Sequence, residues 1–378
     1  ASLVGSEMCI RDRSNSVAGD KSKMNSYELG ASFSLDYPRL LLPWMKNKSN
    51  RFLFPSHTSF KLYVDQLNRA RFFKMLSFGG TVSYDFQPSR TWKHTVTPFR
   101  LAFNTLQHTT SEFDSIINVN KSLALSLGNQ FIPAMSYTFT YDNAPLKKRH
   151  NLWWETSFTS AGNVTSLVYA AFGKGMKEKG KELLGSPFAQ FLKMTSEIRC
   201  LFKVGEKQHI ATRLMGGVLY AYGNQTVAPY SEQFYIGGAN SIRAFTVRSI
   251  GPGTFHPNAD NRYGYIDETG DVKLEANIEY RFPILGDLYG ATFLDAGNVW
   301  LMKKDEARPG GELTMRNFAK SVALGTGVGL RYDLTFLVIR LDLGIALHAP
   351  YDTGKSGYYN IPKFKDGLGL HFAIGYPF

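Results

Sequence analysis

Histidine, cysteine and serine are the residue types that would mark an enzyme or a metal site in this chain, and their spacing marks neither. The eight histidines (positions 57, 94, 108, 150, 209, 256, 348 and 371) and the two cysteines show no metal-ligand spacing. There is no Gly-x-Ser-x-Gly nucleophile elbow and no phosphate-binding loop. His348, near Asp342 in sequence, is expected to be a satisfied member of a polar network. The sequence therefore predicts no catalytic residue, no metal ligand and no cofactor, and a protein that is not an enzyme.

A different segment carries polar chemistry of another kind. Residues 234–245 (FYIGGANSIRAF) place a glycine pair and a lone arginine among aromatic side chains, within a long connection. Glycines permit a tight reversal, and a guanidinium withdrawn from water requires a carboxylate partner. The two strands expected after this connection offer Glu279 and Asp295. We therefore predict that segment 224–272 folds inward and that Arg243 pairs with one of these carboxylates.

Composition limits the architecture that must position these residues. Lys+Arg 43 against Asp+Glu 31 gives a net charge of +12, and aromatic residues make up 14% of the 378 residues. So much apolar surface excludes a disordered chain, and two cysteines exclude a disulfide scaffold. The basic residues form no aromatic-interleaved stripe, so no nucleic-acid partner is predicted. No apolar run approaches the ~18 residues of a membrane helix, so any membrane role must use strands.

Alternation with a period of two dominates from residue 27 onward. In 273–284, apolar residues alternate with charged and polar ones, and the same pattern recurs in 27–37, 131–141 and 192–204. This period indicates half-buried strands. We predict thirteen of them: 27–37, 58–69, 71–86, 91–105, 131–142, 151–160, 189–204, 208–223, 273–284, 288–300, 321–335, 336–348 and 367–378.

Half-buried strands suit either a soluble sandwich or a membrane barrel. Their length of ~10–14 residues suits a tilted bilayer crossing better than the ~5–6 residues of most soluble strands. Aromatic residues near strand ends and mixed charges on the polar faces also favour a barrel, with those polar faces turned to its lumen. The predicted fold class is therefore all-β, a transmembrane antiparallel β-barrel. The residues predicted to face lipid include Leu274, Ile278, Tyr280, Leu341, Leu343 and Phe372.

The connections between strands alternate in length from residue 91 onward. The long ones are 106–130, 161–188, 224–272 and 301–320, and the short ones are turns. Segment 164–184, rich in lysine and glycine, is either a solvated loop or short surface helix, or a contact for acidic lipid headgroups or lipopolysaccharide. Residues 1–26 are expected to be a tail outside the barrel domain of 27–378. Their start resembles a translated sequencing adapter, and the alternative is an ordinary disordered tail.

The motif around Arg243 resembles that of the BamA/TamA-type outer-membrane assembly barrels (bacterial surface antigen superfamily). Their inward loop bears a Gly-Gly-x-x-x-Val-Arg-Gly-Phe-like sequence, which GGANSIRAF (237–245) matches except for one alanine in place of glycine. FLDAGNVW (293–300) looks like the following Phe-x-Asp-x-Gly-x-x-Trp strand of that family. The resemblance assigns to the inward-loop motif Gly237, Gly238, Ile242, Arg243, Ala244 and Phe245, with Glu279 and Asp295 as the partners of the arginine.

The C-terminus is similar to the terminal strand signal of bacterial outer-membrane barrels. Apolar residues alternate with small or polar ones and the chain closes on an aromatic residue. The signal indicates the bacterial outer membrane, and porins share it. Its residues are Leu370, Phe372, Ile374, Tyr376 and Phe378.

The family resemblance implies a function and partners. It implies a sixteen-stranded barrel preceded by periplasmic POTRA domains, so this chain would lack those domains and the first three strands. It implies an assembly factor that inserts or translocates unfolded outer-membrane proteins through a lateral seam, in contact with outer-membrane lipid and lipopolysaccharide. Accessory assembly proteins would bind through the POTRA domains. The alternative function is a passive outer-membrane porin.

Overall fold

A computed structural model describes residues 27–41, 54, 56–69, 72–119, 121–146, 148–256, 268–334 and 336–378. The predicted N-terminal tail (1–26) lies outside these residues. Thirteen of the described strands form one sheet. They are β1 (Tyr27–Tyr37), β2 (His57–Arg69), β3 (Phe73–Phe86), β4 (Trp92–Thr109), β5 (Gln130–Asp142), β6 (His150–Ala161), β9 (Phe191–Lys203), β10 (His209–Ala221), β11 (Val272–Leu285), β12 (Leu288–Trp300), β13 (Ala323–Asp333), β14 (Val338–His348) and β15 (Leu368–Ile374).

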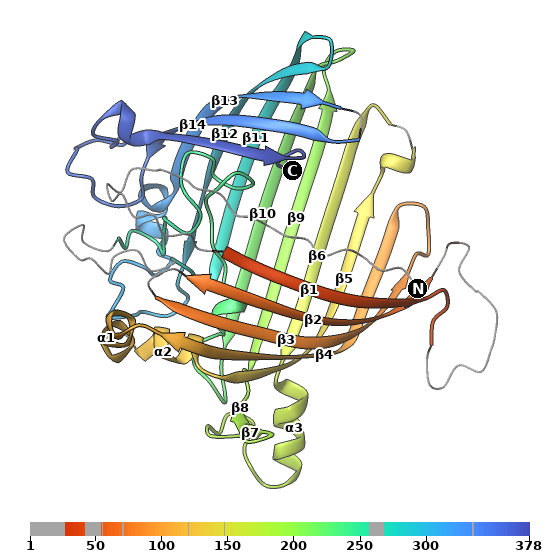
Figure 1. Cartoon of the computed structure of the whole chain (residues 1–378), viewed down its shortest axis with the longest axis vertical. Helices are drawn as coiled ribbons and strands as arrows, with labels where there is room; N and C mark the ends of the chain where they lie inside the picture. The colour runs from red at the N-terminus through yellow and green to blue at the C-terminus, as the bar shows by residue number, and fades with distance from the viewer. Residues whose placement is uncertain are drawn as a thin grey trace.

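Each strand of the sheet pairs antiparallel with its neighbour in the chain, in the order β1 to β6 and then β9 to β15. Figure 1 shows the sheet curling around an interior, with β1 and β15 both on the side facing the viewer. The predicted fold class and the predicted number of strands are confirmed. None of the described helices is both long and apolar enough to cross a membrane.

The remaining elements lie in the connections at one end of the sheet. They are the helices α1 (Ser111–Val119), α2 (Lys121–Leu127) and α3 (Asn163–Ala171), and the hairpin of β7 (Glu182–Leu183) and β8 (Ser186–Pro187). Short 3₁₀ turns occupy 144–146, 230–232, 315–317, 319–321 and 364–367. The sequence predicted connection 106–130 as loop only, whereas β4 continues to Thr109 and two helices follow it.

Alternation along β11 shows why these residues form these strands. Leu274 and Ile278 are exposed on the outer face, whereas Glu275, Asn277 and Glu279 at the alternate positions are buried on the inner face. Leu341, Leu343 and Phe372 are likewise exposed on β14 and β15, as predicted for lipid-facing residues. A shift of one residue would exchange the two faces, so the pattern fixes the register as well as the strand.

The interior contains chain as well as side chains. The connection from β10 to β11 (the inward loop) is described at residues 222–256 and 268–271, and this part passes through the inside of the curled sheet, where Figure 1 draws it in green. Its apolar residues pack against inward-facing residues of the strands and form a buried cluster. The cluster includes Phe234, Ile236, Ile242 and Ile250 of the loop with Ala102, Ile132, Leu219 and Val299 of the sheet. Around this cluster, the barrel interior is thus a packed core that the loop residues help to form.

Candidate functional site

The glycine pair of the inward loop forms the reversal that the sequence predicts. Gly237 and Gly238 have φ values of 93° and 90°, in the left-handed region that favours glycine. A Cβ at Gly237 would lie 2.1 Å from the carbonyl oxygen of Thr246. The amide of Gly238 donates to the carbonyl of Phe245 at 2.8 Å, which closes the turn. The residues between the glycines and Phe245, Arg243 among them, are thereby held at the tip of a compact loop.

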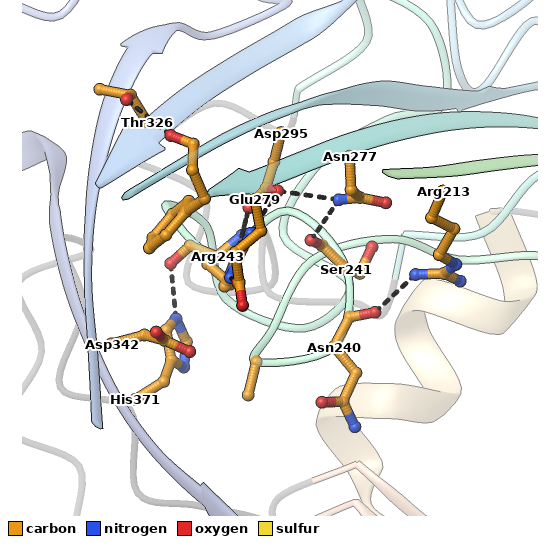
Figure 2. A network of polar contacts seen from close by, with 12 residues as sticks. Arg213, Asn240, Ser241, Arg243, Asn277, Glu279, Asp295, Thr326, Asp342 and His371 are labelled. Carbon is orange, nitrogen blue, oxygen red and sulfur yellow. Dashed lines mark hydrogen bonds and ion pairs between the residues drawn. The ribbon is translucent and has the colours of Figure 1, made fainter. Parts of the chain in front are cut away.

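Arg243 is 1% exposed and is held by both predicted carboxylates. Its Nε and one terminal nitrogen each donate to Asp295 at 2.9 Å, and its backbone amide donates to the same carboxylate at 3.1 Å. The other terminal nitrogen donates to Glu279. The guanidinium plane also lies 3.5 Å from the ring centroid of Phe293. Figure 2 shows Arg243 between these acids and the last strand.

Neighbouring strands position the two carboxylates. Glu279 lies on β11 and Asp295 on β12, both on the inner face. Asn277 is the direct cross-strand partner of Asp295. Its side-chain amide donates to Asp295 at 2.9 Å and to the carbonyl of Ser241 at 3.0 Å, so it joins the carboxylate to the loop. Two uncharged donors, the Arg243 backbone amide and the Asn277 side chain, therefore hold Asp295 in addition to the guanidinium.

Further arginines extend this ion-pair network along the inner faces of β10, β13 and β14 (the wall). Their contacts with the loop were not predicted from the sequence. Arg331 on β13 lies 2.9 Å from Glu279 and 2.6 Å from Asp342 on β14. Arg340, also on β14, donates to the carbonyl of Ala239 in the loop at 2.8 Å. Arg213 on β10 reaches the carbonyl of Asn240 at 2.8 Å. The alternating charges along these strands were visible in the sequence, but which of them touch the loop was not.

Small residues on the wall make room for the loop backbone. A Cβ at Gly344 would lie 2.3 Å from the carbonyl oxygen of Arg243, and one at Gly325 would lie 2.5 Å from the Cβ of Ala244. In the described part of the chain, the non-glycine residues with positive φ are Leu184 and Arg248, so Ala244 has an ordinary backbone conformation. The alanine that replaces the family glycine is thus accommodated by a glycine on the facing strand.

The inward loop has a second point of attachment, which the sequence analysis missed. Glu232 lies 2.5 Å from Arg100 on β4 and 3.0 Å from Lys193 on β9. Ser231 accepts a hydrogen bond from Asn104 at 2.7 Å. Burial raises the pKa of Glu232, but the charges of Lys193 and Arg100 outweigh burial, and the net pKa is lowered from its ordinary value. Glu232 therefore remains a carboxylate that ties the start of the loop to the opposite wall.

The C-terminal residues depart from the predicted strand 367–378. β15 ends at Ile374 because Gly375 adopts a φ of 84° and turns the chain. Leu370, Phe372 and Ile374 keep the predicted outward exposure, between 60% and 64%. Beyond the turn, the Tyr376 ring lies 4.2 Å from the guanidinium carbon of Arg281, and the Phe378 ring lies 6.0 Å from that of Arg243. The predicted end of the strand at residue 378 is therefore wrong, although Tyr376 remains 41% exposed.

Two histidines of the last strands contact backbone carbonyls. His348 contacts the carbonyls of Tyr358 and Lys320, so it belongs to a backbone network rather than to Asp342. His371 on β15 contacts the carbonyl of Arg243 at 2.7 Å, which links the last strand to the loop. Among the described residues, no group of three or more His, Cys, Asp or Glu is placed to hold a metal ion. The arrangement is a set of fixed ion pairs that lock a loop to a wall.

The Omp85 superfamily domain matches residues 13–378. The chain belongs to the Omp85 superfamily. The barrel of BamA from Haemophilus ducreyi lacking POTRA domains 1–3 superposes with a TM-score of 0.59 at 15% identity, over 93% of this chain and 62% of that one. CdiB from Escherichia coli superposes with a TM-score of 0.50 at 12% identity, over 92% and 52%.

Relatives are also found by sequence. Sorting and assembly machinery component 50 homolog A of Xenopus laevis is 31% identical over 43% of this chain and 34% of its own length. Outer membrane protein assembly factor BamA of Nitratidesulfovibrio vulgaris is 28% identical over 48% and 20%. The chain thus spans about a third or less of the curated relatives it matches. This Omp85 chain is a BamA/TamA-type barrel of the bacterial outer membrane, and at family level the matches support protein assembly or translocation.

Proposed function

We propose that this Omp85 chain is the barrel domain of an outer-membrane assembly factor that inserts or translocates substrate polypeptides through a lateral seam. The substrates would be unfolded outer-membrane proteins, and accessory assembly proteins would bind to POTRA domains of the complete protein. The observation that carries the proposal is the buried Arg243, clamped by Asp295 and Glu279 on one wall and contacted by His371 on the last strand. A loop locked in this way fills the interior and braces the end of the sheet.

Strand β15 supports the seam part of the proposal. It contributes seven residues to the sheet, against thirteen in β10 and fourteen in β11, and it ends at a glycine turn. A short final strand presents unpaired N–H and C=O groups along one edge. Such an edge can template an incoming strand by β-augmentation. The loop would hold this edge in place while the substrate strand pairs with it.

Site-specific photocrosslinking of the full-length protein in vesicles tests the proposal. A crosslinker replaces Leu370 on β15 (62% exposed), and the matched control replaces Ile278 on β11 (50% exposed, mid-wall). With an unfolded outer-membrane barrel protein as substrate, we expect crosslinks from position 370 and a background level from position 278. Equal crosslinking at the two positions would overturn the seam.

Substitutions of Arg243 test the same proposal through its ion pairs. Arg243→Ala should lower the yield of folded substrate, and Arg243→Lys should restore part of it, because a point charge cannot make the bidentate fork. Arg199→Ala, a half-exposed arginine on β9, is the control and should leave the yield unchanged. Large, steady, ion-selective single-channel currents without substrate folding would instead identify a passive porin.

A further inference from the structure

Helix α3 carries its apolar residues on the outside. Val164, Leu167 and Val168 follow a spacing of three and four residues, which places them on one stripe of the helix, and Phe172 follows as its C-cap residue. They are exposed by 54%, 61%, 53% and 83%. The inner face instead carries Ser166, which is fully buried. A water-facing helix has the reverse arrangement, so this one is built for apolar surroundings.

A polar network beneath α3 holds the helix in that orientation. The Lys181 side chain is fully buried, and its ammonium donates to the Ser166 hydroxyl at 2.5 Å and to the carbonyls of Met176 and Gly175 at 2.9 and 3.1 Å. The Ser166 hydroxyl also donates to Gln190 at 3.1 Å. Buried polar groups with their partners satisfied fix one arrangement. Rolling the apolar stripe inward would break these bonds, so its exposure is a stable feature.

The neighbouring hairpin also presents an apolar side chain. Leu184 forms the β7–β8 turn at a φ of 51°, in the left-handed region where leucine is disfavoured, and it is 82% exposed. The hydroxyl of Tyr169 on α3 donates to the carbonyl of Glu182, which keeps the hairpin beside the helix. Glycine or asparagine would suit the backbone better at this turn. The leucine is therefore explained by what its side chain meets outside the protein.

The charge beside α3 and its position in the fold indicate what surrounds the helix. The exposed lysines Lys174, Lys177 and Lys179 lie in the turn that follows α3. Figure 1 shows α3 and the hairpin projecting beyond the ends of β6 and β9. The outer faces of these two strands expose Phe158, Leu192 and Met194, which belong to the lipid-facing surface of the barrel. The apolar stripe is thus continuous along the chain with a surface already adapted to lipid, and lysines border it.

We propose that α3 and the β7–β8 hairpin form a membrane anchor at the rim of the barrel (the rim anchor, residues 163–187). Its apolar stripe and Leu184 insert at the boundary between acyl chains and headgroups of the adjacent leaflet, to a depth of ~5–10 Å as is usual for interfacial helices. Lys174, Lys177 and Lys179 contact the lipid phosphates. The occupant is lipid rather than a protein because the stripe extends the lipid-facing wall and the adjoining charge is positive.

Depth-dependent quenching in vesicles tests the rim anchor. In a background with Cys9→Ser and Cys200→Ser, single cysteines at Phe172→Cys, Met315→Cys and Phe372→Cys each receive an environment-sensitive dye. Met315 is the matched control, since it is 86% exposed but lies in the β12–β13 connection at the same rim. Phe372 on β15 is the reference for lipid contact. Protein that floats with the vesicles is isolated first, so the dyes report inserted molecules.

Nitroxide-labelled lipids should quench the dye at position 172 several-fold more than the dye at 315, and shallow nitroxides should quench it more than deep ones. Mixed phosphatidylglycerol and phosphatidylcholine vesicles should strengthen the effect over phosphatidylcholine alone, and the triple variant K174Q/K177Q/K179Q should remove that gain. Equal quenching at 172 and 315, or no dependence on anionic lipid, would overturn the anchor. Quenching at 172 that changes with the protein-to-lipid ratio would identify a second copy as the occupant and also overturn it. No substrate is folded in this assay, so its failure leaves the proposed assembly function unaffected.

Discussion

Two walls of the same sheet differ in what their inner faces meet. The wall of β1 to β3 has inner positions that are mostly half-buried or exposed, and charged residues such as Asp65 and Asp85 stand there beside hydroxyl residues such as Ser83. The wall of β11 to β14 has fully buried inner positions with charged residues, such as Glu279 and Asp342. The inward loop accounts for the difference, because its motif packs against the second wall. Both walls carry charges, but the wall that receives the motif buries its ion pairs completely and has a glycine where the loop backbone approaches most closely.

The largest effect is expected where the charged wall meets the loop. Asp295→Ala leaves the Arg243 guanidinium buried with Glu279 as its remaining acid, and breaking a buried pair typically costs ~3–5 kcal/mol. We expect the loop to become sensitive to added protease while far-ultraviolet circular dichroism keeps its strand signal. Asp85→Ala on β3 is the control from the other wall and should not release the loop. Loss of strand content in Asp295→Ala would show that the pair holds the sheet itself.

The glycine wall predicts the next effect. An alanine at position 344 would place its Cβ 2.3 Å from the Arg243 carbonyl, a backbone atom that cannot turn aside. Overpacking of this kind typically costs ~1–3 kcal/mol. Gly344→Ala should lower the unfolding temperature of the barrel, which is read from the mobility of heated samples on a gel. No single substitution in the loop should restore that temperature. An unchanged unfolding temperature would mean that the loop is free to shift.

Gly325 allows a more specific test of the close contact between the loop and the wall. Its added Cβ would lie 2.5 Å from the Ala244 Cβ, whereas the next nearest atoms are 3.6 Å or more away. Gly325→Ala should therefore destabilise the loop, and Ala244→Gly should restore it in the double variant. The double-mutant cycle measures the coupling directly. Additive effects would show that Ala244 and Gly325 do not share this space.

Features with a local sequence pattern could be predicted from the sequence. Contacts between distant segments without such a pattern could not. Thirteen strands follow from the two-residue period, and the Arg243 contacts were expected from a desolvated guanidinium and two acids at matching depth. Glu232 was missed because it lies in a polar stretch of the loop, and its partners Arg100 and Lys193 come from strands far away in sequence. The C-terminal turn was missed because alternation continues through 375–378 although Gly375 reverses the backbone.

The second attachment of the loop predicts a pH dependence. The folded pKa of Glu232 lies below its unfolded value, so its stabilisation is complete above the unfolded value and is lost as pH falls through the folded one. Protease access to the start of the loop should thus stay constant from neutral pH down to the ordinary glutamate range and rise only below it. Glu232→Gln should raise access at neutral pH, to an extent that corresponds to roughly 1–3 kcal/mol of local stability, and should remove the rise at low pH. A rise between pH 7 and 6 would contradict the assignment.

A single hydroxyl at each wall allows the finest comparison of the two. The Ser241 hydroxyl in the loop accepts from the Gly237 amide at 3.1 Å and donates to Glu275 on β11 at 2.8 Å, whereas the Ser83 hydroxyl on β3 lies 2.9 Å from Thr97 and has no charged partner in the described residues. Hydrogen bonds to charged groups contribute about 1.5–3 kcal/mol, and neutral ones about 0.5–1.5.

Ser241→Ala should therefore destabilise the loop by about 1.5–3 kcal/mol, and Ser83→Ala should change the unfolding free energy by less than about 1 kcal/mol. Chemical unfolding of both variants in the same vesicles measures the difference. Equal losses would show that the wall of β11 to β14 holds its polar groups no more tightly than the wall of β1 to β3, and the contrast between the walls would then lie in packing alone.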